Sequence, residues 1–376
     1  MNKPSLWKEI KEWKIFSKLP EKERQIIFYA EQGGYYSYFE GLISELIDKH
    51  KQEIIYVTSD FSDPVLQNPK VKSFYFNSLL PWFMNFVKCK VFVMTLTDLN
   101  QFHLKRSINQ VHYVYVFHAA VSTNMMYRFG AFDYYDSILC VGKHHVKEIQ
   151  KHEMMHKLPQ KKLIEAGYHR LERIYRAYQE PVEKNTGKKT ILIAPSWGDK
   201  NVIESCGERL TEILLDQGYE VIVRPHPETV KRTPELLQRF SQRFGDNASF
   251  KLEKSVSGDG SLLRADMLIS DCSGIMVEYA FATERPFISM DVPLKIKNQR
   301  YEEIGQPLEL LLRSKVGTIV SMQDLDKIPA IISQLIKNRK RYQQEIIRLR
   351  EQYVFNFGKS SEVGADYIMG LLDANN

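Results

Sequence analysis

Short apolar runs alternate with segments of helical spacing along almost the whole chain, and this alternation limits the possible fold more than any other feature. The runs lie at residues 25–31, 54–59, 71–76, 90–95, 111–118, 137–142, 162–167, 190–197, 219–227, 248–252, 267–269, 287–290 and 317–320. A strand, a helix and a second strand in succession form a parallel pair. Sustained alternation therefore predicts an α/β protein with doubly wound parallel sheets.

A polar stretch at residues 179–189, with one proline and one glycine, separates the alternation into two series. The chain has 376 residues, whereas one domain usually takes about 150. Polar segments of this kind are typical of linkers between domains. We therefore predict one α/β domain over residues 1–178 and a second over residues 188–355.

The net charge bears on the kind of binding partner, and the cysteines bear on metal sites and on the cellular compartment. The net charge of +6 is compatible with anionic substrates or an anionic membrane surface, and it is too small to indicate nucleic acid as a partner. The cysteines Cys89, Cys140, Cys206 and Cys272 form no CxxC pair, so they indicate neither a zinc site nor a redox motif. Unpaired cysteines are typical of a reducing cytoplasm.

Two segments concern the location of the protein. The N-terminal residues lack the apolar core of a signal peptide, and no apolar run reaches the ~20 residues that span a bilayer, so a cytoplasmic location is expected. Residues 5–18 predict a basic amphipathic helix with tryptophans, and residues 72–88 hold a lysine-flanked apolar stretch. These segments favour a peripheral position on the inner face of the membrane, with Trp82 and Phe83 outward. The alternative for each segment is packing within its own domain.

The stretch from residue 265 to residue 293 predicts one complete βαβ unit. Its turn lies at the carboxyl edge of the sheet, where open α/β folds bind ligands. Serine at a helix start caps free amides, glycine lets the backbone approach a ligand closely, and the helix N-terminus attracts phosphate. An ordinary capped helix is the alternative. The turn residues are Ser270, Asp271, Ser273 and Gly274, and Glu278 lies about one helical turn further on.

Polar side chains also follow three other predicted strands. Ser196 and Trp197 follow one strand, Arg224 and His226 follow the next in the motif RPHP, and His118 ends a strand of the first half. The ends of parallel strands share one edge, so the groups of the second half are expected to converge. Arginine, histidine and helix-terminal amides together suit a diphosphate, and a carboxylate such as Glu278 can bind a ribose diol.

These motifs resemble the CDP-glycerol glycerophosphotransferase family of teichoic acid enzymes. The resemblance rests on IAPSW at 193–197, VIVRPHPE at 221–228, LISDCSGIMVEYAFATERPFI at 268–288 and GKSSEVGADYI at 358–368. It implies the GT-B architecture, in which two Rossmann-like domains face each other across a cleft. The second domain would bind the nucleotide donor and the first would bind the acceptor. A C-terminal helix, at residues 356–376, would cross back to the N-terminal domain.

In the first half the resemblance is looser. The family has a tryptophan-histidine-glycine motif that holds the presumed base, and FHAAVST places His118 there, with Ser122 in the following turn. The family also has a Gly-x-Pro-Arg motif before the linker. Here the motif is GYHR, in which His169 replaces the proline and Arg170 is retained. Ser122 and Arg170 are therefore candidate substrate-binding residues.

The implied reaction moves glycerol phosphate from CDP-glycerol to a hydroxyl of a cell-envelope glycan or lipid-linked acceptor. His118 would act as general base, and CMP would leave. His226 and Arg224 would stabilise the phosphate charge, with the backbone and hydroxyls of Ser270 and Ser273 beside them. Asp271 would orient the turn. The family needs no metal and no cofactor, and no DxD pair lies near a strand end.

Two alternatives stay open on the sequence alone. A glycosyltransferase of the same fold would use a nucleotide-activated sugar and react at carbon. An epimerase-like nucleotide-sugar enzyme would share the two domains and a similar Ser-Gly…Glu donor turn. All three classes need a diphosphate site, so the motifs do not separate them.

Overall fold

The structure is a computed structural model of the chain, and it describes residues 6–180, 187–254 and 258–373. Two compact units form: Met1–His118 with Tyr127–Arg170 and Tyr353–Asn376, and Ala119–Met126 with Leu171–Gln352. Residues 181–186 of the predicted linker lie outside the described residues, and the predicted domain limits stay a prediction.

The first unit is built on a seven-stranded sheet of order β3-β2-β1-β4-β5-β6-β7, in which every neighbouring pair is parallel. The chain starts in the middle, at β1, and reverses direction at β4. The strand order therefore reverses between β1 and β4. In open α/β folds, ligands bind at the carboxyl edge of the sheet at such a topological switch point. The strands are β1 (Ile26–Ala30), β2 (Ile54–Thr58), β3 (Lys72–Tyr75), β4 (Val91–Met94), β5 (His112–Val116), β6 (Ser137–Cys140) and β7 (Lys162–Glu165).

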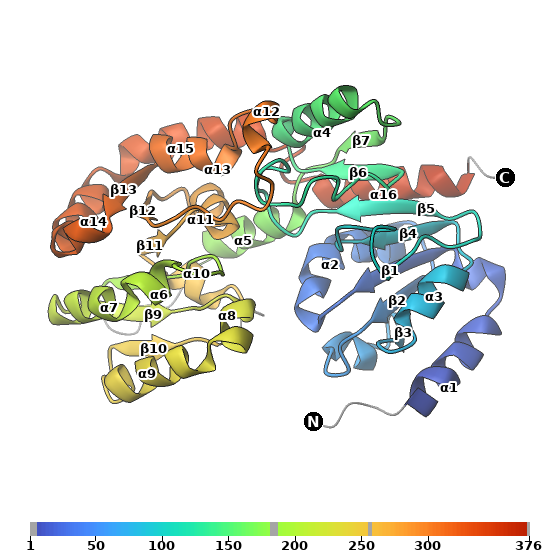
Figure 1. Cartoon of the computed structure of the whole chain (residues 1–376), viewed down its shortest axis with the longest axis horizontal. Coiled ribbons are helices and arrows are strands. Elements are labelled where there is room, and N and C mark those ends of the chain that lie inside the picture. Colours follow the sequence, from blue (N-terminus) through green and yellow to red (C-terminus); the bar gives the residue numbers. More distant parts are fainter. Residues whose placement is uncertain (1–5, 181–186, 255–257, 374–376) are drawn as a thin grey trace. The chain divides into compact units, whose positions relative to one another are not determined.

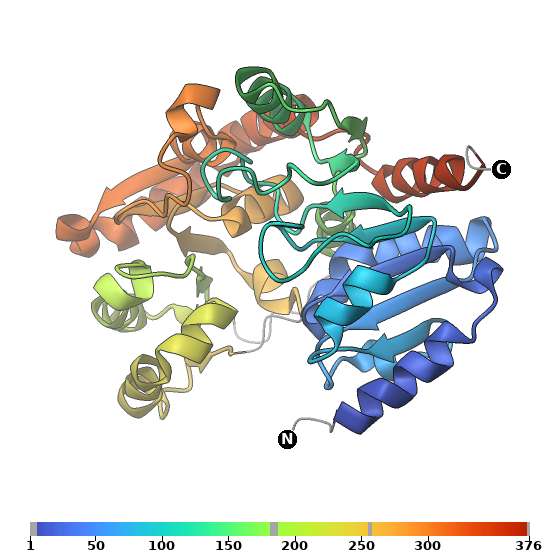
Figure 2. The same cartoon turned by 45° about the vertical axis from the view of Figure 1, so that its right-hand side comes forward.

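Helices cover both faces of this sheet (Figure 1). The helices of the first unit are α1 (Leu6–Ser17), α2 (Tyr36–Ser44), α3 (Leu80–Phe86), α4 (Lys143–His156) and α16 (Ser360–Asp373), with short turns η1 (Glu21–Arg24), η2 (Gly33–Tyr35), η3 (Glu45–Lys49) and η4 (Pro64–Gln67). α2 and α16 pack together on one face, as Figure 2 shows. A Cβ at Gly364 would lie 2.5 Å from the Leu42 side chain, so this close approach requires glycine.

Helix α1 lies along β3 and α3 on the other face. Phe16 is buried there, and the Trp13 ring lies 4.2 Å from the Trp82 ring. The carboxylate of Glu9, also buried, accepts hydrogen bonds from three backbone N–H groups at the start of α3, those of residues 77–79. These groups have no partner inside the helix, so Glu9 satisfies them and complements the positive end of the helix.

One detail of the sequence interpretation is wrong. Phe83 was expected to face outward with Trp82, but the Phe83 side chain is fully buried and stacks on Phe76, 4.6 Å away. The reason is helix geometry. Adjacent side chains of α3 (Leu80–Phe86) point about 100° apart, so Trp82 and Phe83 do not share one face. Trp82 is 41% exposed and lies on the outer side of the helix.

The second unit is built on a six-stranded parallel sheet of order β10-β9-β8-β11-β12-β13. Its switch point lies between β8 and β11. The carboxyl ends of β9, β8, β11 and β12 are therefore consecutive along one edge. The strands are β8 (Thr190–Ile193), β9 (Glu220–Val223), β10 (Phe250–Leu252), β11 (Met267–Ser270), β12 (Phe287–Asp291) and β13 (Gly317–Ser321).

One face of this sheet packs on α7, α9 and α14 through a continuous apolar core, while α11, buried almost all round, covers the other face. The remaining helices complete both layers. The helices are α5 (His169–Gln179), α6 (Val202–Ser205), α7 (Gly207–Asp216), α8 (Pro227–Arg232), α9 (Pro234–Phe244), α10 (Gly260–Arg264), α11 (Gly274–Thr283), α12 (Tyr301–Ile304), α13 (Leu308–Lys315), η5 (Met322–Lys327), α14 (Ile328–Lys337) and α15 (Arg339–Tyr353).

Both sheets have the strand order 3-2-1-4-5-6 of the dinucleotide-binding Rossmann fold, and the first adds a seventh strand. The strands are short and mostly buried, because helices cover both faces. The predicted fold class, with two doubly wound parallel α/β domains, is confirmed.

Candidate active site

His118 lies two residues beyond the end of β5, at the carboxyl edge of the first sheet. Its Nδ1 is 2.8 Å from Oγ1 of Thr95, which follows the neighbouring strand β4. Three tyrosine rings surround the half-buried imidazole at 5.9–6.1 Å between centroids, and Tyr35 stacks almost parallel to it. The other two are Tyr38 and Tyr127. The hydrogen bond to Thr95 and the aromatic packing thus orient the ring.

The Thr95 hydroxyl suits a histidine that changes its protonation state. A hydroxyl can accept a hydrogen bond from Nδ1–H or donate one to an unprotonated Nδ1. The contact between Thr95 and His118 therefore persists when the ring gains a proton. An imidazole held in this way can take a proton from a substrate hydroxyl.

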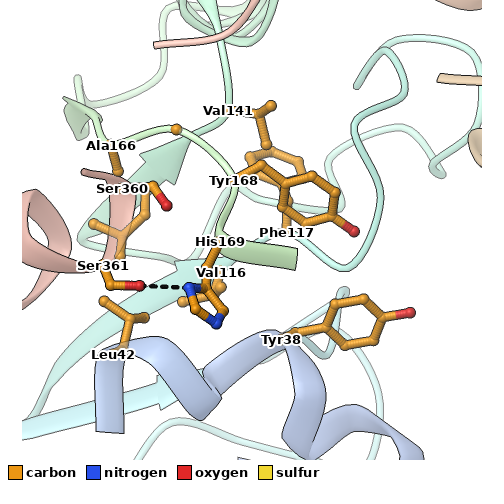
Figure 3. Close-up of a pocket in the computed structure, with 12 residues that line it drawn as sticks. Tyr38, Leu42, Val116, Phe117, Val141, Ala166, Tyr168, His169, Ser360 and Ser361 are labelled. Carbon is orange, nitrogen blue, oxygen red and sulfur yellow. Dashed lines mark hydrogen bonds between the residues drawn. The ribbon is translucent and has the colours of Figure 1, made fainter. Parts of the chain in front are cut away.

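Arg170 and His169, from the GYHR motif, lie near the same edge of the first unit. The Arg170 guanidinium is buried and lies 5.4 Å above the Tyr38 ring. A hydrogen bond of 2.7 Å joins His169 Nδ1 and Ser361 Oγ (Figure 3). Both residues line a cavity of about 20 Å³, which has room for about one water molecule. A Cβ at Gly41 would lie 2.1 Å from the Ser361 oxygen, so α2 needs glycine there. His169 thus joins α5 to α16.

In the second unit, His226 caps helix α8. Its Nδ1 accepts the backbone N–H of Glu228 at 3.1 Å. A nitrogen that accepts a hydrogen bond carries no proton, so in the neutral ring the proton lies on Nε2. His226 is therefore set up as a hydrogen-bond donor. This geometry suits binding of a phosphate oxygen better than it suits action as a base.

Arg224, at the end of β9, is buried, and its Nη1 donates to Ser261 Oγ at 3.2 Å. Ser261 lies in α10 and is fully buried. The hydrogen bond helps to hold the guanidinium, a group with five N–H donors, at the carboxyl edge. Arg224 and His226 follow the same strand, so the guanidinium and the imidazole lie at one position of the edge.

Ser196, Ser270 and Asp271 hold the loops of adjacent strands together. Ser196 donates its backbone N–H and its Oγ to the two oxygens of Asp271, at 2.8 and 3.0 Å. Ser270 donates its Oγ to the carbonyl of Ala194 at 2.7 Å. Burial raises the pKa of Asp271, and the two hydrogen bonds from Ser196 oppose that rise. All three residues are buried and stabilise the turn before α11.

The start of α11 offers backbone donors. Ser273 is the N-cap residue with an extended backbone, and its side chain makes no capping hydrogen bond. Ser273 and Gly274 are half-exposed, whereas the helix is buried from Met276 onward. A Cβ at Gly274 would lie 3.2 Å from the Cβ of Ala119, so the chain approaches this turn closely. The free amides of a ten-residue helix are a suitable phosphate site.

Two buried glutamates lie near this turn. Glu278, on the first turns of α11, is 6% exposed. Glu309, on α13, accepts the N–H and the Oγ of Ser122 at 2.9 and 2.7 Å, and burial raises the pKa of Glu309. The Asn124 amide donates to two carbonyls of the 301–305 segment. Ser122 is thus part of an anchor for Ala119–Met126, and its predicted contact with substrate stays a prediction.

Trp197 is surrounded by cations that the sequence interpretation missed. Lys295 Nζ lies 3.3 Å from the centroid of the indole ring, Arg232 Cζ lies at 4.9 Å and Lys297 Nζ lies at 5.8 Å. The His226 ring is 6.1 Å from the same indole. The sequence signal for the two lysines is LKIKN at 294–298, which comes after the end of strand β12.

Lys295 is the most perturbed of these cations. Burial, and next the charge of Lys297, lower the pKa of Lys295 to about 7. Asp271 and Glu228 act in the opposite direction. A lysine that is close to half-protonated at neutral pH, beside other cations at a strand end, is a candidate for function.

In residues 6–180, 187–254 and 258–373, no helix is long and apolar enough to span a bilayer. Within the same part of the chain no group of three His, Cys, Asp or Glu side chains is arranged to bind a metal ion. The expectation of a metal-independent reaction stays a prediction.

Two parallel sheets in the Rossmann strand order, each with polar side chains along its carboxyl edge, place the chain in the GT-B fold class. The model of the CDP-glycerol:poly(glycerophosphate) glycerophosphotransferase family matches residues 13–368. The chain therefore belongs to this family. The predicted family, the enzyme class and the transfer of glycerol phosphate from CDP-glycerol to a cell-envelope acceptor are confirmed.

Solved structures show the same fold at low sequence identity. The wall teichoic acid polymerase TagF has a TM-score of 0.64 at 17% identity, over 98% of this chain and 95% of that one. A putative UDP-N-acetylglucosamine 2-epimerase from Listeria monocytogenes has a TM-score of 0.60 at 12% identity, over 90% and 93%. S. aureus MnaA with UDP has a TM-score of 0.58 at 13% identity, over 90% and 94%. No curated protein matches the chain.

Proposed function

We propose that the chain adds glycerol phosphate to a terminal hydroxyl of a teichoic-acid-like or lipid-linked acceptor, with His118 as the general base. The observation that carries the proposal is the position of His118. It follows β5, the strand beside β4, which borders the switch point of the first sheet, and Thr95 and three tyrosines orient its ring. The likeness to a wall teichoic acid polymerase supports an acceptor of this chemistry.

The reaction balances as a displacement at phosphorus. His118 takes the proton of the acceptor hydroxyl, and the oxygen attacks the β-phosphorus, which carries the glycerol. The bond between the β-phosphorus and the bridging oxygen breaks, and CMP leaves with the electron pair. His118 then releases its proton to solvent. The negative charge that moves onto the leaving phosphate is matched by fixed donors on the second unit.

We assign the donor to the second unit on the chemistry of its edge. Arg224 and the Nε2 proton of His226 bind phosphate oxygens, together with the amides of Ser273 and Gly274. Glu278 accepts hydrogen bonds from the ribose hydroxyls. The positioning residues behind them are Ser196, Ser270 and Asp271, whose hydrogen bonds are internal to the protein. Trp197 lies beside His226, and Arg170 lies on the acceptor side with Tyr38.

The first prediction concerns the reaction itself. The purified chain is expected to release CMP from CDP-glycerol when a glycerol-phosphate-primed lipid acceptor is present, and to lengthen that acceptor by one or more glycerol phosphate units. CMP would be measured by anion-exchange chromatography, and the acceptor would be measured by mass spectrometry. UDP-activated and GDP-activated sugars serve as controls.

Three results would contradict this proposal. Turnover of a nucleotide sugar in place of CDP-glycerol would indicate a glycosyltransferase. Nucleotide release that needs no acceptor would indicate an epimerase-like enzyme. Acceptor extension by a group other than glycerol phosphate would change the transferred group.

Exposed aromatic and aliphatic side chains on the first unit support a peripheral membrane location, on the cytoplasmic face. Trp7 on α1 is 77% exposed, and Trp82 and Phe86 on α3 are 41% and 40% exposed. The rings of Trp82 and Phe86 are 5.3 Å apart, and Trp13 joins α1 to them. α1 also carries two exposed lysines, Lys11 and Lys14. Tryptophan with lysine suits the boundary between headgroups and acyl chains.

The second prediction tests this surface. Replacing Trp7, Trp82 and Phe86 together by serine is expected to lower binding to phosphatidylglycerol vesicles by at least tenfold. Full burial of one such side chain contributes about 1.5–3 kcal/mol, so partial burial of three exceeds the roughly 1.4 kcal/mol that a tenfold change requires. Flotation of the full chain with the vesicles would measure the fraction of protein bound. Ile319→Ser is the matched control, since Ile319 is 46% exposed on the second unit. Equal recovery of the triple variant and the wild type would exclude this surface.

A further inference from the structure

Three cationic side chains, Arg232, Lys295 and Lys297, surround the indole of Trp197 in the second unit; we call this set the Trp197 cation cluster. Their charged atoms lie 3.3–5.8 Å from the ring centroid. They come from α8 and from the segment after β12, while Trp197 follows β8. The cluster therefore joins separate strand ends of one sheet edge, the same edge as His226.

Among the described residues, Lys295 differs from Arg232 in that no carboxylate pairs with it. Arg232 donates from Nε to Glu228 at 3.0 Å, so an acid close by neutralises it. Within the part of the chain that the structure describes, no carboxylate lies within 4 Å of the Lys295 ammonium. It rests on the face of the Trp197 ring, which stabilises a cation less than full hydration does.

The other charged groups near Lys295 do not supply the missing negative charge. Asp271 is engaged by both donors of Ser196, and Glu228 is engaged by Arg232 and Lys231. Both acids favour the charged form of Lys295, but burial and the charges of Lys297 and Arg232 outweigh them. The site thus has an excess of positive charge in a partly buried position, and an anion would remove the excess.

We propose that Lys295 is a donor-binding residue of the transferase, whose ammonium leaves the Trp197 ring to bind the diphosphate of CDP-glycerol. The inference rests on the proposed function, because it assigns the ligand of the donor site. His226 lies beside the same indole and offers its Nε2 proton, so one phosphate group would contact both side chains. Trp197 is the platform that holds the ammonium while the site is empty.

Proton uptake is the consequence that a purely structural lysine would not produce. The pKa of Lys295 is lowered to about 7 without ligand, so about half of the side chains are neutral at pH 7. A bound diphosphate removes the cause of the lowering and raises this pKa, so binding takes up a proton. Donor affinity is therefore greatest well below pH 7 and falls as the pH rises through this pKa, by roughly tenfold or more between pH 7 and pH 8.5.

The third prediction tests Lys295 by isothermal titration of the full chain with CDP-glycerol, whose phosphates keep a constant charge over this range. Titration at pH 7 in two buffers of different ionisation enthalpy measures proton uptake, and titration from pH 6 to pH 8.5 measures affinity. For Lys295→Ala we expect a 10- to 100-fold loss of affinity and no such uptake. For Lys295→Arg, which stays protonated, we expect affinity close to that of the wild type at pH 7 and no decline up to pH 8.5.

The matched control is Lys327→Ala, which removes an exposed lysine that pairs with Asp324 on the same unit, and it is expected to behave as the wild type. Wild-type affinity and proton uptake in both Lys295 variants would overturn the inference, and it would leave the proposed function intact if CMP is still released. Lys295-dependent binding without any CMP release would support this site and contradict the proposed reaction. A wild-type chain that binds no CDP-glycerol at all would overturn both.

Discussion

Replacing His118 by alanine is expected to lower kcat for CMP release by about 10²–10⁴-fold, because a positioned general base contributes that much to proton transfer. The dissociation constant for CDP-glycerol should change little, since His118 belongs to the first unit and donor binding is assigned to the second. Single-turnover kinetics would measure the chemical step, and titration calorimetry would measure donor binding.

Two variants test whether the imidazole itself is responsible. Thr95→Val keeps the shape of the Thr95 side chain but removes its hydrogen bond to Nδ1, and is expected to cost about tenfold in kcat through loss of ring orientation. Thr95→Ser retains a hydroxyl and should restore most of that loss. His103→Ala removes an exposed histidine of the same unit and should have no effect. Full turnover by His118→Ala would remove the base assignment.

The fold was predictable because its determinants are local. Each strand is a short apolar run and each helix repeats its apolar positions, so the order of elements follows from neighbours in the chain. Parallel pairing then brings strand ends to one edge, which is why Ser196, His226 and Asp271 were expected together. Their strands are indeed adjacent, in the order β9-β8-β11, and Ser196 contacts Asp271 directly.

Other features of the candidate site depend on contacts that no local pattern records. Ser122 and Glu309 are 187 positions apart, yet both hydrogen bonds of Ser122 end on that carboxylate. Lys295 lies in an irregular segment after β12, where neither helical nor strand periodicity marks a side chain as functional. Phe83 was misplaced for a related reason. A lysine-flanked apolar stretch does not say which side of a seven-residue helix faces the sheet.

The hydrogen-bond geometry also separates the two histidines that the sequence grouped as catalytic. His118 meets a hydroxyl that tolerates both protonation states, whereas His226 meets a backbone N–H that requires an unprotonated Nδ1. The first arrangement suits a group that gains a proton during the reaction. The second arrangement suits a group that keeps its Nε2 proton and donates it as a hydrogen bond throughout. A general base and an electrostatic donor thus have different neighbours, although both are histidines at strand ends.

His226→Ala is expected to lower kcat/KM for CDP-glycerol by about 10²–10³-fold, the usual cost of removing one fixed donor from a site where charge develops. The same change removes the cap of α8, which is worth about 0.5–2 kcal/mol of stability, so a lower melting temperature is also expected. Asparagine separates the two roles. His226→Asn can still cap the helix, because asparagine is among the best N-cap residues, but its amide is too short to replace Nε2. We therefore expect wild-type thermal stability with a loss of kcat/KM close to that of alanine. If His226→Asn were as active as the wild type, capping α8 would be the whole role of this histidine, and the donor phosphate would be bound by Arg224 and the α11 amides without it.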